Sequence, residues 1–402
     1  MTKVQLNFLT EVLSQRLADE SFLRMLQTST LMDRKKLKMG LTVLATCLVG
    51  MSLTTVLFIK VSPQFGAPAK AKQTNRVLNS PNFKDGKFHN LSDTAMMTGF
   101  KFESIYGWIF DGNKVPSNPL PVIKIDTAGQ ISESDSITKV TWLGHSAVLL
   151  EIGGQKILLD LMLGDVVGPH KWLGTKRFDT NHSINIDDLP NVDAVLISHD
   201  HYDHLEYSTI VKLKSKSVKF CVPLGVGAHL IEWGVEENNI IEFDWWESID
   251  LNGLTIVSTP ARHFSGRGII DRNTTLWGSW VIKSETASVY FSGDTGYGKH
   301  FKEIGEAYGP FDLTMLDCGQ YNDQWAYVHM FPEEAVQANL DLKGKRVMPI
   351  HWGAFKLSLH PWNDPALRIR KRADELEVAV TIPQIGEPVI LGKPHQNQPW
   401  ME

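Results

Sequence analysis

The stretch Val195-Leu196-Ile197-Ser198-His199-Asp200-His201-Tyr202-Asp203-His204 decides the fold of this chain of 402 residues. An apolar run over residues 194–197 predicts a buried strand, and four side chains that can bind a metal follow it directly. His199 and His201 project to the same side of extended backbone, so both imidazoles can hold one ion. Asp203 and His204 come where the chain bends and can hold a second ion. The stretch therefore predicts a metal site at the edge of a sheet.

Three further candidate ligands follow later apolar runs. They are His263 in Thr259-Pro260-Ala261-Arg262-His263, Asp294 in Tyr290-Phe291-Ser292-Gly293-Asp294, and His351 in Val347-Met348-Pro349-Ile350-His351. Asp294 and His351 each follow residues that favour strands and are soon followed by glycine, which is typical of a strand that ends in a site-forming turn. A centre with two ions needs such distant ligands, ideally with one carboxylate that bridges both ions.

The pattern of strands supports a sheet framework around this site. Alternating apolar residues before and after Gly153-Gly154 predict a hairpin of paired strands. Residues 219–223 then predict a strand and residues 227–233 a helix, so later units alternate strand and helix.

The order His-x-His-x-Asp-His, followed by spaced His, Asp and His, resembles the metallo-β-lactamase superfamily. Within it, five strings resemble the branch of N-acyl-phosphatidylethanolamine-hydrolysing phospholipases D and its bacterial relatives: Thr141-Trp142-Leu143-Gly144-His145, Gly174-Thr175-Lys176-Arg177-Phe178, Asp244-Trp245-Trp246, His329 before Pro332-Glu333-Glu334-Ala335, and Ile350-His351-Trp352-Gly353. The resemblance covers residues 136–391. It implies an α+β fold of four layers, the αββα sandwich, in which two mixed sheets lie face to face with helices outside.

The resemblance also implies a ligand set. It assigns one zinc ion to His199, His201 and His263, the other to Asp203, His204 and His351, and the bridge to Asp294. Iron or manganese can occupy such sites of His and Asp as well. We expect His145 to support a ligand, because none of the seven ligand places is left for it. Asp160 precedes Leu161 where the family usually has proline, which leaves the shape of that loop open.

The expected chemistry follows from such a metal pair. Two zinc ions that share a hydroxide lower its pKa towards neutrality and neutralise charge on a phosphoryl or carbonyl oxygen. Asp203 and Asp294 are the expected catalytic carboxylates, and Asp203 could orient the nucleophile or take its proton. We expect a zinc phosphodiesterase of phospholipase D type that acts on N-acyl-phosphatidylethanolamine-like lipids. The alternatives are a lactonase or other carbonyl-ester hydrolase of the same fold, and a non-catalytic metal-binding membrane protein.

Five further side chains are candidates for contact with the substrate. Lys176, Arg177, Arg262 and Arg267 could bind a phosphate, although a surface salt bridge explains each of them equally well. His329 belongs to one of the family strings and is the fifth candidate.

A membrane anchor is predicted near the N-terminus. Residues 39–59 carry no charged side chain and are long enough to cross a hydrocarbon core as one helix. Four basic residues precede this run at 34–38, whereas Lys60 alone follows it, so the positive-inside rule places residues 1–38 in the cytosol. The run is too long and begins too late for a cleaved signal peptide. We therefore expect a single-pass protein of the bacterial inner membrane with an extracytoplasmic catalytic domain.

These signals divide the chain into five parts. They are a leader with an amphipathic-helix pattern (1–38), the membrane helix (39–59), a linker and extension (60–135), the catalytic domain (136–392) and a tail (393–402). A net charge of −5 argues against a nucleic-acid partner. The expected partners are a membrane and a phospholipid or other small-molecule ester, and relatives of this branch suggest a homodimer. Three cysteines make no disulfide scaffold, but a bridge between Cys221 and Cys318 stays open beside two buried free thiols.

Overall fold

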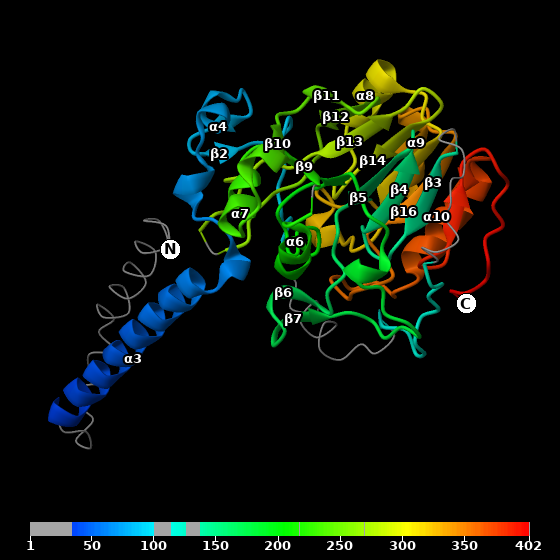
Figure 1. Cartoon of the computed structure of the whole chain (residues 1–402). Helices are drawn as coiled ribbons and strands as arrows, with labels where there is room; N and C mark the ends of the chain where they lie inside the picture. Colours follow the sequence, from blue (N-terminus) through cyan, green and yellow to red (C-terminus); the bar gives the residue numbers. More distant parts are fainter. Residues whose placement is uncertain (1–33, 100–113, 126–136, 217, 269, 402) are drawn as a thin grey trace. The chain divides into compact units, whose positions relative to one another are not determined.

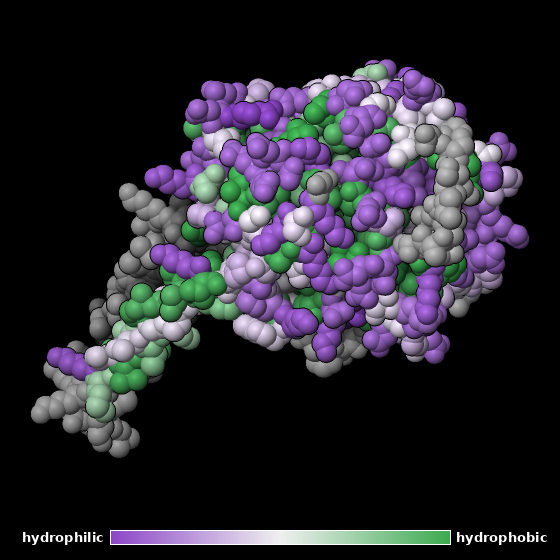
Figure 2. All heavy atoms as spheres, viewed as in Figure 1, coloured by the Kyte–Doolittle hydropathy of each residue, from purple (hydrophilic) through white to green (hydrophobic). Residues whose placement is uncertain are grey.

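The structure, a computed structural model, describes residues 34–99, 114–125, 137–216, 218–268 and 270–401 and forms two compact units, residues 1–62 and 63–402. The amphipathic pattern of the leader lies almost wholly outside the described residues. In the first unit, helix α3 (Arg34–Val61) contains the stretch Leu37–Val61, which is long and apolar enough to cross a membrane. None of its most apolar window is buried, and the exposed surface of the helix is mostly hydrophobic (Figure 2). The predicted membrane helix is thus present as a candidate span.

The second unit contains two sheets of seven strands (Figure 1). The first consists, in spatial order, of β10 (Ile240–Phe243), β9 (Lys219–Pro223), β8 (Ala194–Leu196), β5 (Gln155–Leu159), β4 (Val148–Ile152), β3 (Lys139–Trp142) and β18 (Pro388–Ile390). The second consists of β11 (Ser248–Leu251), β12 (Leu254–Thr259), β13 (Ser279–Lys283), β14 (Ser288–Phe291), β15 (Leu313–Asp317), β16 (Arg346–Ile350) and β17 (Ala379–Val380). Each sheet mixes parallel and antiparallel pairs, as predicted.

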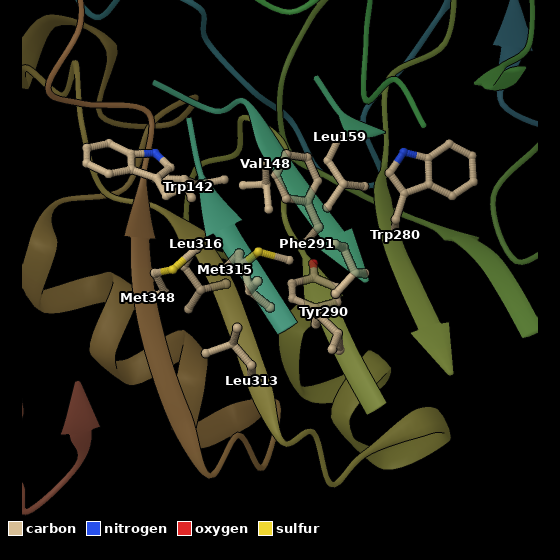
Figure 3. Close-up of a cluster of buried hydrophobic side chains, with 14 of the residues drawn as sticks. Trp142, Val148, Leu159, Trp280, Tyr290, Phe291, Leu313, Met315, Leu316 and Met348 are labelled. Carbon is tan, nitrogen blue, oxygen red and sulfur yellow. The ribbon is translucent and has the colours of Figure 1, made fainter. Parts of the chain in front are cut away.

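The main core lies between the two sheets. Figure 3 shows Trp142, Val148 and Leu159 of the first sheet in one cluster with side chains of the second, among them Tyr290, Phe291 and Met315. All six are at most 1 % exposed. Burying a side chain of this size stabilises a fold by about 1.5–3 kcal/mol. These contacts hold the sheets face to face and fix the edges from which the site is built.

Helices cover the outer faces of both sheets. On the first sheet, α6 (Tyr207–Leu213) and α7 (Gly227–Glu232) bury Ile210 and Leu230 in a cluster with Val195 of β8. On the second, α9 (Pro332–Asp341) contacts β15 and β16, and α10 (Asp364–Glu375) contacts β16 and β17. Helix α8 (His300–Tyr308) contacts α9. The predicted αββα sandwich is therefore confirmed.

The extension after the membrane helix packs on the sandwich. It contains short elements: η1 (Pro63–Phe65), η2 (Ala69–Lys72), α4 (Asn75–Asn79), β1 (Phe83–Lys84) and β2 (Lys87–Phe88). Val77 and Phe88 are fully buried in a cluster with Leu276 and Trp277 of the sandwich domain. At the other end of the chain, Trp400 packs against Trp352, and Met401 is buried in the main core. Both ends of the second unit thus belong to its packed structure.

Two smaller features complete the second unit. A separate hairpin, β6 (Val166–His170) and β7 (Leu173–Lys176), pairs with neither large sheet.

Cys221 and Cys318 are both buried and both free, and burial raises the pKa of the Cys221 thiol to about 12. Burial also raises the pKa of the Cys318 thiol, so neither thiol is ionised to the reactive thiolate at neutral pH.

The buried His300 makes the fold sensitive to acid. Burial, helped by the nearby charge of Arg262, lowers the pKa of His300 to about 3. The unfolded chain binds a proton at this side chain below about pH 6.5, whereas the native chain does not until about pH 3. The native state therefore loses up to about 1.4 kcal/mol per pH unit as the pH falls between these values. His300→Gln should remove this part of the acid sensitivity.

The measurement is Tm of the detergent-solubilised protein at pH 7.5 and pH 5. We expect Tm to fall less for His300→Gln than for wild type. His182→Gln, at an exposed site, is the control and should keep the wild-type difference. An unchanged pH dependence in His300→Gln would contradict the assignment.

Candidate metal centre

The candidate ligands lie in loops that begin at one end of the strands. His199 follows β8, His263 follows β12, Asp294 follows β14 and His351 follows β16. In the second sheet, β14, β15 and β16 run parallel to one another. β12 pairs antiparallel with β13, and β13 pairs antiparallel with β14, so β12 runs in the same direction as these three strands. The two sheets meet here, since the His145 amide donates to the Trp352 carbonyl and the His351 amide donates to the His145 carbonyl. Side chains that are far apart in sequence are thereby gathered at one edge.

Sharp turns place these side chains. His145, Asp160, Gln320 and His351 all have φ between 41° and 67°, in the left-handed region that residues other than glycine rarely adopt. Each such residue costs about 1–3 kcal/mol of backbone strain, which the surrounding structure must offset. Gly293 before Asp294 has φ of 55°, and a Cβ there would lie 2.4 Å from the Ser198 Cβ. The loop that carries Asp294 and the loop that carries His199 therefore approach each other so closely that only glycine fits at position 293.

The structure brings all seven predicted ligands together. One group is formed by His199, His201, His263 and Asp294, whose candidate ligand atoms all lie within 4.8 Å of one another. Asp203, His204 and His351 form a second group with His145. The Asp294 Oδ2 atom lies 3.1 Å from His204 Nε2 and 3.2 Å from His351 Nε2, and 3.8 Å from both His199 Nε2 and His263 Nε2. Asp294 thus stands between the groups, in the place of a bridging carboxylate.

The opposite ring nitrogens of four of these histidines are held by hydrogen bonds. Nδ1 of His199 contacts the Ser198 hydroxyl, and Nδ1 of His263 donates to the Val328 carbonyl. Nδ1 of His204 donates to Asp160 at 2.7 Å, and Nδ1 of His351 donates to Asp317 at 3.2 Å. These contacts leave Nε2 facing the cluster, as in protein metal sites whose ligands are oriented by outer partners.

The charges of the cluster fit a bound cation. Burial lowers the pKa of His199 and His263 well below its usual value, so both rings are neutral and present lone pairs. For Asp294, burial opposes ionisation, but His204 and His351 outweigh it and hold the pKa well below the usual value. Nε2 of His204 and Oδ1 of Asp294 are buried and make no hydrogen bond within the described residues. Converging lone pairs and ionised carboxylates are the donor set of a transition-metal site.

His145 supports Asp203. Its Nε2 lies 2.9 Å from Asp203 Oδ2, and burial, reinforced by the charge of His351, lowers the pKa of His145 to about 4. The ring is therefore neutral, and its Nε2–H donates a hydrogen bond to the carboxylate. Burial alone would raise the pKa of Asp203, but this bond and the charge of His204 hold it well below its usual value. His145 thus orients a ligand, the role expected from the sequence.

A pocket of about 270 Å³ opens beside the cluster. Apolar side chains form much of its wall: Met96, Met97, Phe264, Trp325, Val328 and Leu357. Arg272 is the only Lys or Arg among the described residues that line it. Its guanidinium lies 5.0 Å from the centre of the Phe264 ring, which in turn packs on His201 and His263. A positive group therefore stands at the pocket, one aromatic ring away from the ligands.

Of the five residues predicted to contact the substrate, only His329 lines the pocket beside the cluster. His329 lines the pocket, and its Nδ1 lies 2.9 Å from Asp317 Oδ2. The guanidinium groups of Arg177, Arg262 and Arg267 donate to backbone carbonyls, and Lys176 is exposed at the end of β7. None of these four cations lines the pocket of the cluster.

Sequence reasoning overlooked several residues of the site. Asp317 is the last residue of β15, follows the apolar residues Met315-Leu316 and precedes Cys318-Gly319. This resembles the pattern that identified Asp294 and could have revealed Asp317. Asp160 was singled out only for the shape of its loop, yet it accepts hydrogen bonds from Ser198 and from His204. Arg272, Met96 and Met97 carry no signal in the sequence, because tertiary packing alone places them at the pocket.

Comparison with known proteins supports this picture. A family model described as a β-lactamase superfamily domain matches residues 155–352. An uncharacterised protein of Mycobacterium tuberculosis is 43 % identical over 326 residues, which are 80 % of this chain and 87 % of that protein. The N-acyl-phosphatidylethanolamine-hydrolyzing phospholipase D 1 of Caenorhabditis elegans is 35 % identical over 256 residues, 61 % of this chain and 71 % of that protein. Among solved structures, an isothiocyanate hydrolase from Delia radicum gut bacteria matches in fold with a TM-score of 0.50 and 21 % identity, covering 62 % of this chain and 98 % of that chain.

Proposed function

Because this chain belongs to the metallo-β-lactamase superfamily, and is thus a metal-dependent hydrolase, we propose that it is a zinc phosphodiesterase of phospholipase D type. Its proposed substrate is N-acyl-phosphatidylethanolamine or a similar membrane lipid. Two observations support the proposal. The similar protein of Caenorhabditis elegans is named as an N-acyl-phosphatidylethanolamine-hydrolyzing phospholipase D, and this chain has a candidate membrane helix. We further propose that α3 anchors the chain in the inner membrane with residues 63–402 outside the cytosol.

The observation that carries the proposal is the composition of the pocket beside the cluster. Its apolar wall suits the hydrocarbon part of a lipid, and Arg272 suits an anionic phosphodiester. An uncharged lactone or carboxyl ester would give Arg272 no charge to bind. The pocket thus favours a phosphodiester over the carbonyl esters that the same fold could hydrolyse.

The seven ligands would hold two zinc ions, which would activate a water molecule and neutralise charge on a phosphoryl oxygen. The chain's own residues divide the remaining work. Asp203 and Asp294 both line the pocket, but the Asp203 side chain is 11 % exposed whereas that of Asp294 is only 2 % exposed. We therefore assign to Asp203 the orientation of the attacking water and the acceptance of its proton. Arg272 would hold the phosphate, and the apolar wall would exclude competing water.

The test is release of phosphatidic acid from N-acyl-phosphatidylethanolamine by zinc-loaded protein in detergent, followed by mass spectrometry. Release supports the proposed reaction. If a soluble anionic phosphodiester is cleaved but the lipid is not, the reaction class stands and the lipid assignment fails. If only a lactone is opened, the phosphodiesterase proposal fails.

Arg272 gives a second test of the substrate class. Arg272→Gln removes the only Lys or Arg among the described pocket residues, and a charge-assisted hydrogen bond contributes about 1.5–3 kcal/mol. We expect kcat/KM for an anionic phosphodiester to fall about 10- to 100-fold. An uncharged carboxyl ester, if it is cleaved at all, should lose less than about 3-fold, because no charge pair is broken. Arg372→Gln, on the exposed side of α10, is the matched control. Equal losses on both esters would argue against a phosphate contact.

A further inference from the structure

The tip of the β6–β7 hairpin carries an unusual set of exposed side chains. Trp172 is 72 % exposed and Leu173 is 45 % exposed. Lys171 and Lys176 are exposed on either side of them. Tryptophan favours the boundary between lipid and water, because its ring is apolar and its N–H is polar, and lysine is attracted to anionic headgroups. Such a combination on a protruding hairpin is typical of a surface that meets a bilayer.

The hairpin lies beside the point at which the chain leaves the candidate membrane helix. Gln64 of η1 lines a second cavity of about 270 Å³ together with Val166, His170 and Lys171 of the hairpin. Pro63, the first residue of η1, is two residues after Val61, the last residue of α3. Two residues of extended chain span at most about 7 Å. The link between α3 and the segment that adjoins the hairpin is therefore at most about 7 Å long.

The metal loop adjoins the same segment. Phe65 of η1 packs edge to face on Tyr202, with ring centres 6.5 Å apart, and Tyr202 lies between the ligands His201 and Asp203. The Arg267 guanidinium donates to the Gln64 carbonyl at 2.9 and 3.0 Å, and to the carbonyl of Asp200 at 2.7 Å. Segment η1 thus adjoins both the hairpin and the ligand loop.

We propose that the tip of the β6–β7 hairpin is a second membrane contact. Trp172 and Leu173 enter the headgroup region of the bilayer in which α3 is anchored, and Lys171 and Lys176 face anionic lipid headgroups. With the anchor alone, the domain could rotate about the chain at residue 62. The hairpin contact removes this freedom and keeps the metal loop beside the lipid. The inference rests on α3 crossing a membrane, and it is independent of which ester is cleaved.

The experiment measures the depth of a spin label at the hairpin tip. The full chain is reconstituted in vesicles of mixed zwitterionic and anionic phospholipid, in a Cys47→Ala background. Cys221 and Cys318 are buried and should stay unlabelled. A nitroxide is attached at Trp172→Cys, with Leu173→Cys as a second variant in case the first does not fold. The matched control is Leu340→Cys on α9, which is 42 % exposed in wild type.

The two sites should respond differently to paramagnetic quenchers. At position 172 or 173 we expect the label to collide more with oxygen, which concentrates in lipid, than with a water-soluble nickel chelate. At position 340 the order should be reversed. Equal, water-like accessibility at the tip and at the control would overturn the proposal.

A functional readout separates this inference from the proposed function. Trp172→Ser should lower the turnover of a vesicle-embedded substrate several-fold and leave the turnover of a soluble ester unchanged. If no ester is cleaved by wild type, the proposed function fails, while the depth measurement still decides the hairpin. If the lipid is cleaved while the tip reports water, the hairpin proposal fails and the function stands.

Discussion

Asp294→Asn should lower kcat/KM of the zinc-loaded protein by at least about 10²- to 10³-fold, the largest effect that we expect from any single substitution. Its Oδ2 atom faces four histidine nitrogens at 3.1–3.8 Å and stands between the two ligand groups. An amide keeps the shape but removes the negative charge that would be shared by two cations. We therefore expect the metal content to fall from two ions per chain to one or none.

The measurement combines turnover with metal analysis of the same preparation. Asp312→Asn is the matched control: Asp312 lies at the start of β15, away from the cluster, and forms an exposed ion pair with Lys345. The control should keep both the metal and the activity. A variant Asp294→Asn that retained two ions per chain and most of the turnover would show that Asp294 is not the bridge.

Lys72→Met should lower the free energy of unfolding of the second unit by about 3–5 kcal/mol. The Lys72 ammonium group is completely buried, 3.0 Å from Asp271 Oδ2 and 3.9 Å from Asp200 Oδ2. Burial opposes ionisation of Asp200, but His229 and Lys72 outweigh it and hold its pKa well below the usual value. Methionine would leave these carboxylates charged and without their cation. Such a loss is costly, because an uncompensated charge stays in a medium of low dielectric constant.

Lys70→Met is the matched control for this effect. Lys70 belongs to the same short helix, η2, and its side chain is exposed. We expect thermal unfolding in detergent to show a clear drop in Tm for Lys72→Met and almost none for Lys70→Met. Because Asp200 lies between His199 and His201, the Lys72 variant should also bind zinc more weakly. Equal Tm values for the two variants would contradict the role of the buried ion pair.

The sequence by itself determined the fold class and the ligand types, because both are carried by local motifs. His and Asp after apolar runs identified the metal-binding side chains, and the order of these residues resembles a known superfamily, which implies the fold. An apolar run that ends in polar residues marks the end of a strand and pointed to His199, and such a run with glycine close behind it pointed to Asp294 and His351. The candidate membrane helix could also be predicted from a local pattern, because an uncharged run of sufficient length needs no partner elsewhere in the chain. The same rule applied to Asp317 would have added one more residue of the site.

Only the tertiary structure decided what surrounds the ligands. Arg177 and Arg267 carry the same charge as Arg272, but their donors are taken up by backbone carbonyls, whereas Arg272 lines the pocket. Lys72 acts on Asp200, 128 positions later in the chain, through an ion pair that no local pattern announces. The physical reason is that a charged side chain has the same sequence signature in solvent, in a buried pair or at a substrate. Packing between distant segments determines which of these environments it occupies.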